Sequence, residues 1–305
     1  MMKKNILLAG GDERQLKMAE YLHEQGMSVA MLGFPEESGL PTEIPCHQAG
    51  EELKWEYLDV VVFPASGIQS GMTVHAPLSA SPLKVEENWL QRLPREARIC
   101  TGISTDEADQ LMKKSGRTYT ALLEQEETAL YNAVPTAEGV LLTAIQNTDE
   151  TIHGSRVVVL GFGRTGSVIA RTFSALGAYV EVGTSDPVEK ARAKTYGHFV
   201  FHLDETAQAL QRKDLCINTI PALLLTKNML QDVSVRTLII DIASRPGGTD
   251  FSYAAQRKMT ALWTPGLPGK TAPKTAGRIL GSVLLQLLED TEKKKGDFPQ
   301  DCTNE

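Results

Sequence analysis

The residue pattern with the clearest chemical meaning is a glycine turn that follows a run of apolar residues. Val157–Leu160 lead directly into Gly161-Phe162-Gly163-Arg164-Thr165-Gly166, and a segment with helical spacing of apolar residues follows, which Gly177 ends. In this order Gly161 allows a tight turn, Gly163 lets the backbone approach a pyrophosphate, and Gly166 lets the helix pack close to the strand. The helix N-terminus supplies free N–H groups and a positive dipole end. We predict that these residues bind a dinucleotide; the alternatives are a structural glycine turn or a methyl-donor site of similar shape.

The second predicted strand bears on which dinucleotide binds. It covers Tyr179–Val182 and ends at Gly183-Thr184-Ser185. An NAD site usually places an acidic residue about 20 residues beyond the fingerprint, but Glu181 falls inside the strand and a glycine stands at the strand's tip. A glycine followed by two hydroxyls leaves room and donors for a 2′-phosphate. The sequence therefore favours NADP, with NAD as the alternative, and Asp186 argues against a phosphate if its side chain points inward.

Other strand ends carry residues that suit a ligand, because ligands of open parallel sheets bind outside the carboxyl ends of the strands. We expect Asn218, Thr219 and Pro221 to lie beside the nicotinamide ribose, with an ordinary β-turn as an equal alternative. Asp241 and Ser244 belong to a glycine-containing segment that we expect to close the nicotinamide side.

Three cations are candidates for binding a substrate carboxylate. Arg245 has a planar fork that binds a carboxylate with two hydrogen bonds. Lys274 stands at the entry to the last predicted helix, and Arg14 follows the first glycine turn. A solvated side chain is the alternative for Arg245 and for Lys274, whereas Arg14 should point into the cleft. No histidine occurs after His202, so the late acid/base histidine of the D-2-hydroxyacid dehydrogenases is missing and the sequence names no base.

Composition places these residues in an ordinary globular protein. The chain has 305 residues, 42% of them hydrophobic and 23% charged, with a net charge of -7. There is no basic cluster typical of nucleic-acid binding and no apolar run of the ~20 residues that a membrane span requires. The four cysteines are widely separated, which indicates reduced thiols in a cytoplasm and gives no metal-site spacing.

Strands and helices alternate along the chain, which predicts an α/β fold of two Rossmann-like, doubly wound parallel-sheet domains with a cleft between them. The first domain covers residues 1–134 and lacks the second and third glycines of the fingerprint. Pro135 opens a bridging helix over 135–150, and the cofactor domain follows over 151–271. A helix over 272–290 has a broad apolar stripe and should pack back onto the first domain. Residues 291–305 form a polar tail.

The motifs taken together resemble the family of the dipicolinate synthase A subunit. They are Gly10-Gly11-Asp12-x-Arg14-Gln15, Pro135-Thr136-x-Glu138-Gly139, Thr151–Ser155, the glycine turn, Asn218–Pro221, Asp241–Gly248 and Pro265–Gly277. The last two segments are also similar to alanine dehydrogenase and to the NAD-binding subunit of transhydrogenase.

The resemblance implies oxidation of dihydrodipicolinate, or of its hydrated precursor, to dipicolinate in the mother cell of a sporulating bacterium. It also implies a flavoprotein-like partner, the dipicolinate synthase B subunit, and related architectures suggest a homo-oligomer. Arg14, Arg245 and Lys274 would then face the two carboxylates of the ring. Two alternatives are an alanine- or hydroxyacid-dehydrogenase-like activity and a non-catalytic nucleotide-binding subunit.

Overall fold

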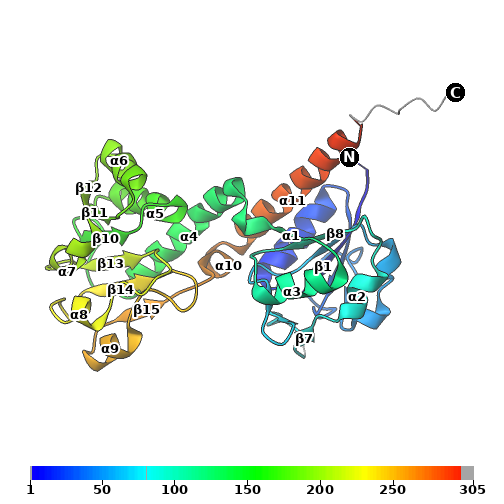
Figure 1. The fold of residues 1–305 in the computed structure, drawn as a ribbon, viewed down its shortest axis with the longest axis horizontal. Coiled ribbons are helices and arrows are strands. Elements are labelled where there is room, and N and C mark those ends of the chain that lie inside the picture. The colour runs from blue at the N-terminus through cyan, green and yellow to red at the C-terminus, as the bar shows by residue number, and fades with distance from the viewer. Residues whose placement is uncertain (1, 80, 297–305) are drawn as a thin grey trace. The chain divides into compact units, whose positions relative to one another are not determined.

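The chain forms two compact α/β units, each built on a six-stranded parallel sheet (Figure 1). A computed structural model describes residues 2–79 and 81–296. One unit comprises Met1–Thr128 and Pro273–Glu305, and the other comprises Ala129–Ala272. The predicted fold of two Rossmann-like parallel-sheet domains is confirmed.

The sheet of the first unit has the strand order β3-β2-β1-β4-β8-β9. Its strands are β1 Asn5–Ala9, β2 Ser28–Leu32, β3 Cys46–His47, β4 Val60–Val62, β8 Arg98–Thr101 and β9 Thr120–Ala121. A small antiparallel sheet lies between β4 and β8 in the sequence and consists of β5 Ile68–Gln69, β6 Thr73–Val74 and β7 Leu83–Lys84. Short 3₁₀ turns are η1 Gly50–Glu52, η2 Trp55–Tyr57 and η3 Leu122–Glu124.

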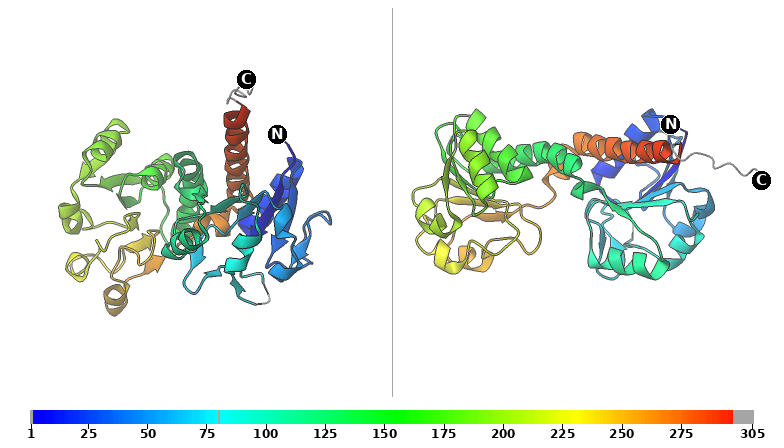
Figure 2. Two further views of the ribbon diagram at one scale, coloured as in Figure 1. Left: turned by 45° about the vertical axis from the view of Figure 1, so that its right-hand side comes forward. Right: turned by 45° about the horizontal axis from the view of Figure 1, so that its top comes forward.

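Helices cover both faces of this sheet because the central strands are apolar on both sides. Ile6 and Leu8 of β1 share a core with α1 and α11, whereas Leu7 and Ala9 share the opposite core with α2 and α3. α11 packs along α1, and the two helices lie side by side in Figure 1, with two further views in Figure 2. The helix bounds are α1 Glu13–Glu24, α2 Glu87–Arg92, α3 Asp106–Ser115 and α11 Pro273–Gly296.

The sheet of the second unit has the order β12-β11-β10-β13-β14-β15. Its strands are β10 Arg156–Leu160, β11 Tyr179–Gly183, β12 Phe199–Phe201, β13 Leu215–Asn218, β14 Leu238–Asp241 and β15 Ala261–Trp263. Leu160 pairs with Gly183 on one side and with Asn218 on the other, so the three strand ends lie level. The strand order reverses at β10 and β13, and dinucleotides bind at such a switch point.

Two sets of helices cover the second sheet. Val157 and Val159 share a core with α4, α5 and α6, while Val158 and Leu160 share the other with α8 and α9. The elements are α4 Glu126–Gln146, α5 Arg164–Ala175, α6 Pro187–Thr195, η4 Leu203–Glu205, α7 Thr206–Ala209, α8 Lys227–Leu230, α9 Phe251–Gln256 and α10 Leu267–Thr271.

Two predicted element bounds are wrong. The helix that we expected over 135–150 begins at Glu126, with Pro135 in its interior, and ends at Gln146. Glu126 and Glu127 lie in its first turn, where the helix dipole favours acidic residues, and the missing N–H of a single proline does not end it. Residues 291–296 of the expected polar tail belong to α11, and residues 297–305 lie outside the described residues.

Candidate nucleotide-binding site

The glycine turn after β10 has the geometry of a phosphate cradle. Gly161 has a φ of 87°, and α5 begins at Arg164 with Gly163 as an N-cap whose position provides no side-chain hydrogen bond. The first-turn N–H groups of α5 are therefore not capped by a side chain of the N-cap residue. Thr219 Oγ1 donates to the Leu160 carbonyl over 2.8 Å and ties the turn to the end of β13.

The three glycines of the turn have different surroundings. A Cβ on Gly166 would overlap the Gly161 carbonyl oxygen, and a Cβ on Gly161 would lie 2.5 Å from Thr219 Oγ1. At Gly163 a Cβ would meet Glu189 Oε1 at 3.4 Å and no other described atom within 4 Å. Gly161 and Gly166 are therefore required by packing, whereas Gly163 leaves open space beside the start of α5. This arrangement fits a bound pyrophosphate.

The tip of β11 differs from the sequence-based interpretation. A Cβ on Gly183 would lie 2.7 Å from the Phe201 ring, so packing within the sheet explains this glycine. Thr184 is buried and its hydroxyl donates to Glu189 Oε2 over 2.6 Å. Asp186 is the N-cap of α6 and accepts from the Val188 and Glu189 N–H groups at 2.8 Å each. Ser185 is exposed.

Phe162 contributes its backbone to the turn and its ring to the core. Its N–H donates to Glu189 Oε2 over 2.9 Å, and Arg192 donates to its carbonyl oxygen. The buried ring has the Arg192 guanidinium 5.6 Å from its centroid and makes an edge contact with His198. Burial lowers the pKa of His198. Arg164 and Thr165 follow in the first turn of α5, with Arg164 exposed and Thr165 half-buried.

The residues expected beside the nicotinamide ribose make hydrogen bonds within the protein. Asn218 is fully buried, donates from Nδ2 to the Ile220 carbonyl over 3.1 Å and accepts the Ile220 N–H over 3.2 Å. Pro221 follows in an exposed position. Asn218 and Thr219 therefore shape the turn at the switch point, and contact with a nucleotide stays a prediction for both.

Asp241 holds the loop that presents Arg245. Its fully buried carboxylate accepts the Ala243 N–H at 3.0 Å, the Gly248 N–H at 2.8 Å and the Thr249 hydroxyl at 2.6 Å. Ser244 and Arg245 lie exposed at the apex of the closed loop. The Arg245 guanidinium lies 5.4 Å from the centroid of Trp263, whose Nε1 donates to the Ala243 carbonyl over 3.0 Å. Asp241 thus fixes the conformation of the loop that carries Arg245 at the carboxyl end of β14.

Two of the predicted cations belong to the first unit. Arg14 is buried and donates from Nε and Nη2 to the Asp12 carboxylate, with a shortest distance of 2.7 Å. Burial alone would raise the pKa of Asp12, but the hydrogen bonds and charge of Arg14 outweigh burial and lower it. Lys274 is exposed in the first turn of α11.

The structure brings His75 to the same glycine turn of the first unit, a placement that the sequence does not reveal. The Gly11 N–H donates to the His75 carbonyl over 2.7 Å, and the charge of His75 also favours ionised Asp12. No sequence pattern marks this contact, because His75 follows β6 and is placed by the antiparallel pairing of β6 with β5 and β7. Nearby in the chain, Ser66 Oγ is buried and meets no hydrogen-bond partner among the described residues.

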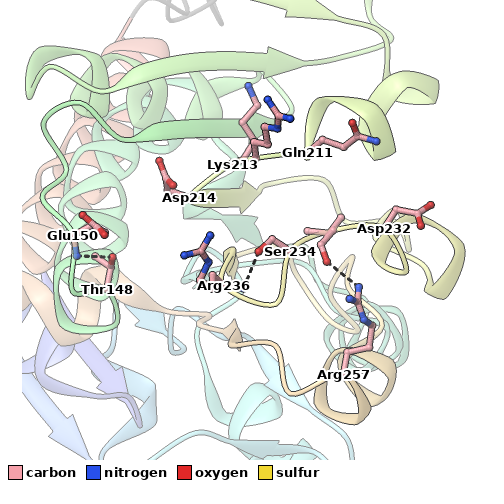
Figure 3. Close-up of a pocket in the computed structure, with 11 residues that line it drawn as sticks. Thr148, Glu150, Gln211, Lys213, Asp214, Asp232, Ser234, Arg236 and Arg257 are labelled. Carbon is pink, nitrogen blue, oxygen red and sulfur yellow. Dashed lines mark hydrogen bonds between the residues drawn. The ribbon is translucent and has the colours of Figure 1, made fainter.

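A cavity of about 710 Å³ lies at the opposite edge of the second sheet (Figure 3). Lys213 and Asp214 directly precede β13, and Arg236 precedes β14, so the cavity faces the amino ends of the strands. Two of its cations already have partners: Lys213 pairs with Glu181, and Arg257 donates to the Val233 carbonyl over 2.9 Å. The cavity is therefore a poor candidate for the cofactor, which binds at carboxyl ends.

Within residues 2–79 and 81–296, no group of three or more metal-ligating side chains is assembled, and no helix is long and apolar enough to cross a membrane.

Comparison with known proteins places the chain in a family. Residues 5–123 match the N-terminal domain of the dipicolinate synthase A subunit, and residues 121–303 match the alanine dehydrogenase/PNT C-terminal domain. The dipicolinate synthase A subunit of Bacillus subtilis (strain 168) is 40% identical over 95% of this chain and 98% of its own length. The chain belongs to the family of the dipicolinate synthase A subunit.

Solved structures agree with this membership. The crystal structure of the dipicolinate synthase A subunit from Bacillus halodurans has a TM-score of 0.89 and 42% identity, covering 94% of this chain and 99% of that one. The transhydrogenase of Sinorhizobium meliloti shares the fold, with a TM-score of 0.66 and 14% identity over 94% of each chain. The second unit of this family member is thus dehydrogenase-like, and such domains bind a nicotinamide cofactor.

Proposed function

We propose that this chain oxidises dihydrodipicolinate, or its hydrated precursor, to dipicolinate with a nicotinamide dinucleotide as the electron acceptor. The observation that carries the proposal is the open position at Gly163 beside the start of α5, in a chain of this family. Gly161, Phe162, Gly163, Arg164, Thr165 and Gly166 would hold the pyrophosphate through backbone N–H groups. When bound, the cofactor supplies a hydride acceptor.

The substrate would be held by its two carboxylates. The N–H groups of Arg245 meet no acceptor among the described residues, while the Trp263 ring orients the guanidinium. This combination suits a two-point hydrogen bond to a carboxylate. We assign Arg14 and Lys274 as further counter-charges, with Asp12 fixing the rotamer of Arg14. Oxidation of dihydrodipicolinate removes one hydride and one proton from the ring and makes it aromatic, and the hydrated precursor must lose one water as well. Orientation and charge complementarity are therefore the main tasks of the protein.

Three finer parts of the proposal rest on the family. We propose that the chain works in the cytoplasm of a sporulating mother cell and that it forms a homo-oligomer. We also propose that a second subunit of dipicolinate synthase is its partner. The Bacillus subtilis relative is itself named as one subunit of a synthase, which supports a partner. The sequence-based preference for NADP rested on Gly183, Thr184 and Ser185 and stays a prediction; the packing at Gly183 and the bonded hydroxyl of Thr184 weaken its basis.

An absorbance assay tests the proposal against its alternatives. The pure chain is mixed with freshly prepared dihydrodipicolinate and NAD⁺ or NADP⁺, with and without the second subunit. We expect the reduced-nicotinamide band to appear whenever this chain is present, and to be absent when only the second subunit is added. Turnover that needs only the second subunit would give this chain a non-catalytic role. Robust reduction of 2-oxo acids with NADH would instead indicate an alanine- or hydroxyacid-dehydrogenase-like enzyme.

A further inference from the structure

We propose that Glu189 selects the dinucleotide at its adenosine ribose, so that this chain prefers NAD(H) to NADP(H). The inference rests on the proposed function, because it assumes that the glycine turn after β10 binds a nicotinamide dinucleotide. It reverses the preference for NADP that was drawn from Gly183, Thr184 and Ser185.

Glu189 reaches the glycine turn from the first turn of α6. Its Oε2 accepts the Phe162 N–H at 2.9 Å and the Thr184 hydroxyl at 2.6 Å. The carboxylate therefore joins three elements: the glycine turn, the end of β11 and the start of α6. Asp186 caps α6 by accepting the Glu189 N–H over 2.8 Å, which fixes the backbone from which the side chain extends.

This position corresponds to the ribose site of a dinucleotide fold. Gly183 at the tip of β11 pairs with Leu160, the residue before the glycine turn. The Glu189 carboxylate bridges Phe162 and Thr184, which lie just beyond these two strand ends, and so lies beside the expected path of the adenosine ribose. Acidic residues at this point accept a hydrogen bond from the ribose 2′-hydroxyl. Here the carboxylate is delivered by a helix in place of the strand tip, where Thr184 stands.

One oxygen of the carboxylate is left for the ribose. Among the described residues, both side-chain hydrogen bonds to Glu189 end on Oε2, while Oε1 lies toward the open position at Gly163. An ionised carboxylate accepts hydrogen bonds and donates none, so it suits a hydroxyl. A 2′-phosphate is also an acceptor and carries up to two negative charges, which the carboxylate repels.

Two arginines near this point are already engaged by other groups. Arg192 donates to the Phe162 carbonyl and lies over the Phe162 ring, and Arg164 also has a partner already. The Thr184 hydroxyl, which the sequence offered as a phosphate donor, donates to Glu189 instead. Of the two hydroxyl residues after β11, Thr184 is bonded to this carboxylate, whereas Ser185 is exposed and is not bonded to it among the described residues.

The test compares the affinities for two nucleotides. If Glu189 had only a structural role, replacing it would lower both affinities together. The full chain is titrated with NADH and with NADPH, and the dissociation constants are measured by nicotinamide fluorescence and by calorimetry. We expect the wild type to bind NADH at least about tenfold more tightly than NADPH. Glu189→Gln removes the charge while keeping the shape, and should reduce this ratio about tenfold or more, chiefly by improving NADPH binding.

Two further variants complete the design. Glu205→Gln makes the same change at an exposed glutamate of η4 and should leave the ratio unchanged. Glu189→Asp keeps the charge on a shorter side chain and provides a second readout if Glu189→Gln does not fold. A wild-type chain that prefers NADPH, or an unchanged ratio in folded Glu189→Gln, would overturn the inference alone. A wild-type chain that binds neither nucleotide would overturn the proposed function as well.

Discussion

At the scale of single residues, the glycines of the cofactor turn show how one residue type meets two different needs. Gly166 is required because α5 crosses so close to the Gly161 carbonyl that a Cβ does not fit. Gly163 has open space around its Cα, so its small size matters for a ligand and much less for the apo fold.

Gly163→Val should therefore weaken nucleotide binding by about a hundredfold or more, roughly 2.7 kcal/mol, because the side chain occupies the pyrophosphate position. The free energy of unfolding should fall by at most about 1 kcal/mol, because Val is a poorer N-cap than Gly. Gly166→Ala is the matched comparison and should cost about 1–3 kcal/mol of folding stability. Nucleotide titration and urea unfolding check both variants, and unchanged affinity in Gly163→Val would mean that the phosphates bind elsewhere.

Arg245 is the cation whose geometry best suits a substrate carboxylate. Arg245→Ala should raise the KM for the dicarboxylate about tenfold to a hundredfold, since a hydrogen bond to a charged group contributes roughly 1.5–3 kcal/mol. The dissociation constant of the cofactor should stay within about twofold. Arg245→Lys, which keeps the charge but loses the planar fork, should recover only part of the effect. Equal losses of substrate and cofactor affinity would move Arg245 to the cofactor.

The Asp12–Arg14 pair predicts an acid-sensitive contribution to stability. Because Arg14 lowers the pKa of Asp12 in the folded chain, the contribution is fully present above the ordinary value of 3.8 and is lost as the pH falls through the lower, folded value. Asp12→Asn keeps a good N-cap for α1 but removes the charge. Urea unfolding measured between about pH 5 and pH 2 should then show a weaker loss of stability in the variant than in the wild type. Parallel curves would contradict the assignment.

At the scale of elements, the last helix is joined to the first by close backbone packing. Gly277 of α11 faces α1, where a Cβ would overlap the Arg14 carbonyl oxygen and lie 2.8 Å from the Met18 nitrogen. Leu280, Val283, Leu284 and Leu288 extend the contact along the shared core.

Gly277→Ala should destabilise the chain by about 1–3 kcal/mol, because backbone atoms of α1 cannot move aside without shifting the helix. Gly281→Ala is the matched control: its Cβ would meet the Tyr21 ring at 2.6 Å, and a side chain at this position can turn away. Urea unfolding should therefore rank Gly277→Ala as the more destabilised. An equal or reversed order would show that the two helices do not approach at Gly277.

The sequence predicts elements best where pattern and length agree. The bounds of β1, β2, β8, β13 and β15 follow directly from short apolar runs with turn residues behind them. β3 could not be predicted, because two residues become a strand only through pairing with β2. The start of α4 was misplaced because Pro135 is typical of a first turn, whereas here tertiary packing carries the helix through it.

In the candidate site, too, local features could be predicted from the sequence and contacts between distant segments could not. The backbone cradle is local in sequence and could be predicted, but Glu189 acts through a side chain that reaches back from the next helix. Its one sequence signal is the Asp186-Pro187 start of α6, which places Glu189 in the first turn. Likewise the bonds of Asp241 and of Asn218 depend on loops that fold back onto strand ends.

At the scale of the whole molecule, both units have the same order of strands but differ at the first helix. In the first unit the N-cap of α1 is Asp12, whose carboxylate accepts the Arg14 N–H and also pairs with the Arg14 guanidinium. In the second unit the N-cap of α5 is Gly163, which has no side chain. The first-turn N–H groups are therefore occupied by the Asp12 side chain in the first unit and left open to a phosphate in the second.

Hydrogen–deuterium exchange of the full chain, with and without saturating NADH, shows which of the two glycine turns holds the nucleotide. We expect slower exchange of the backbone N–H groups in residues 161–166 and 183–189 when the nucleotide is bound, and no change at residues 10–16. Protection of residues 10–16 without protection of 161–166 would place the nucleotide on the first unit and show that the turn after β10 is not its site.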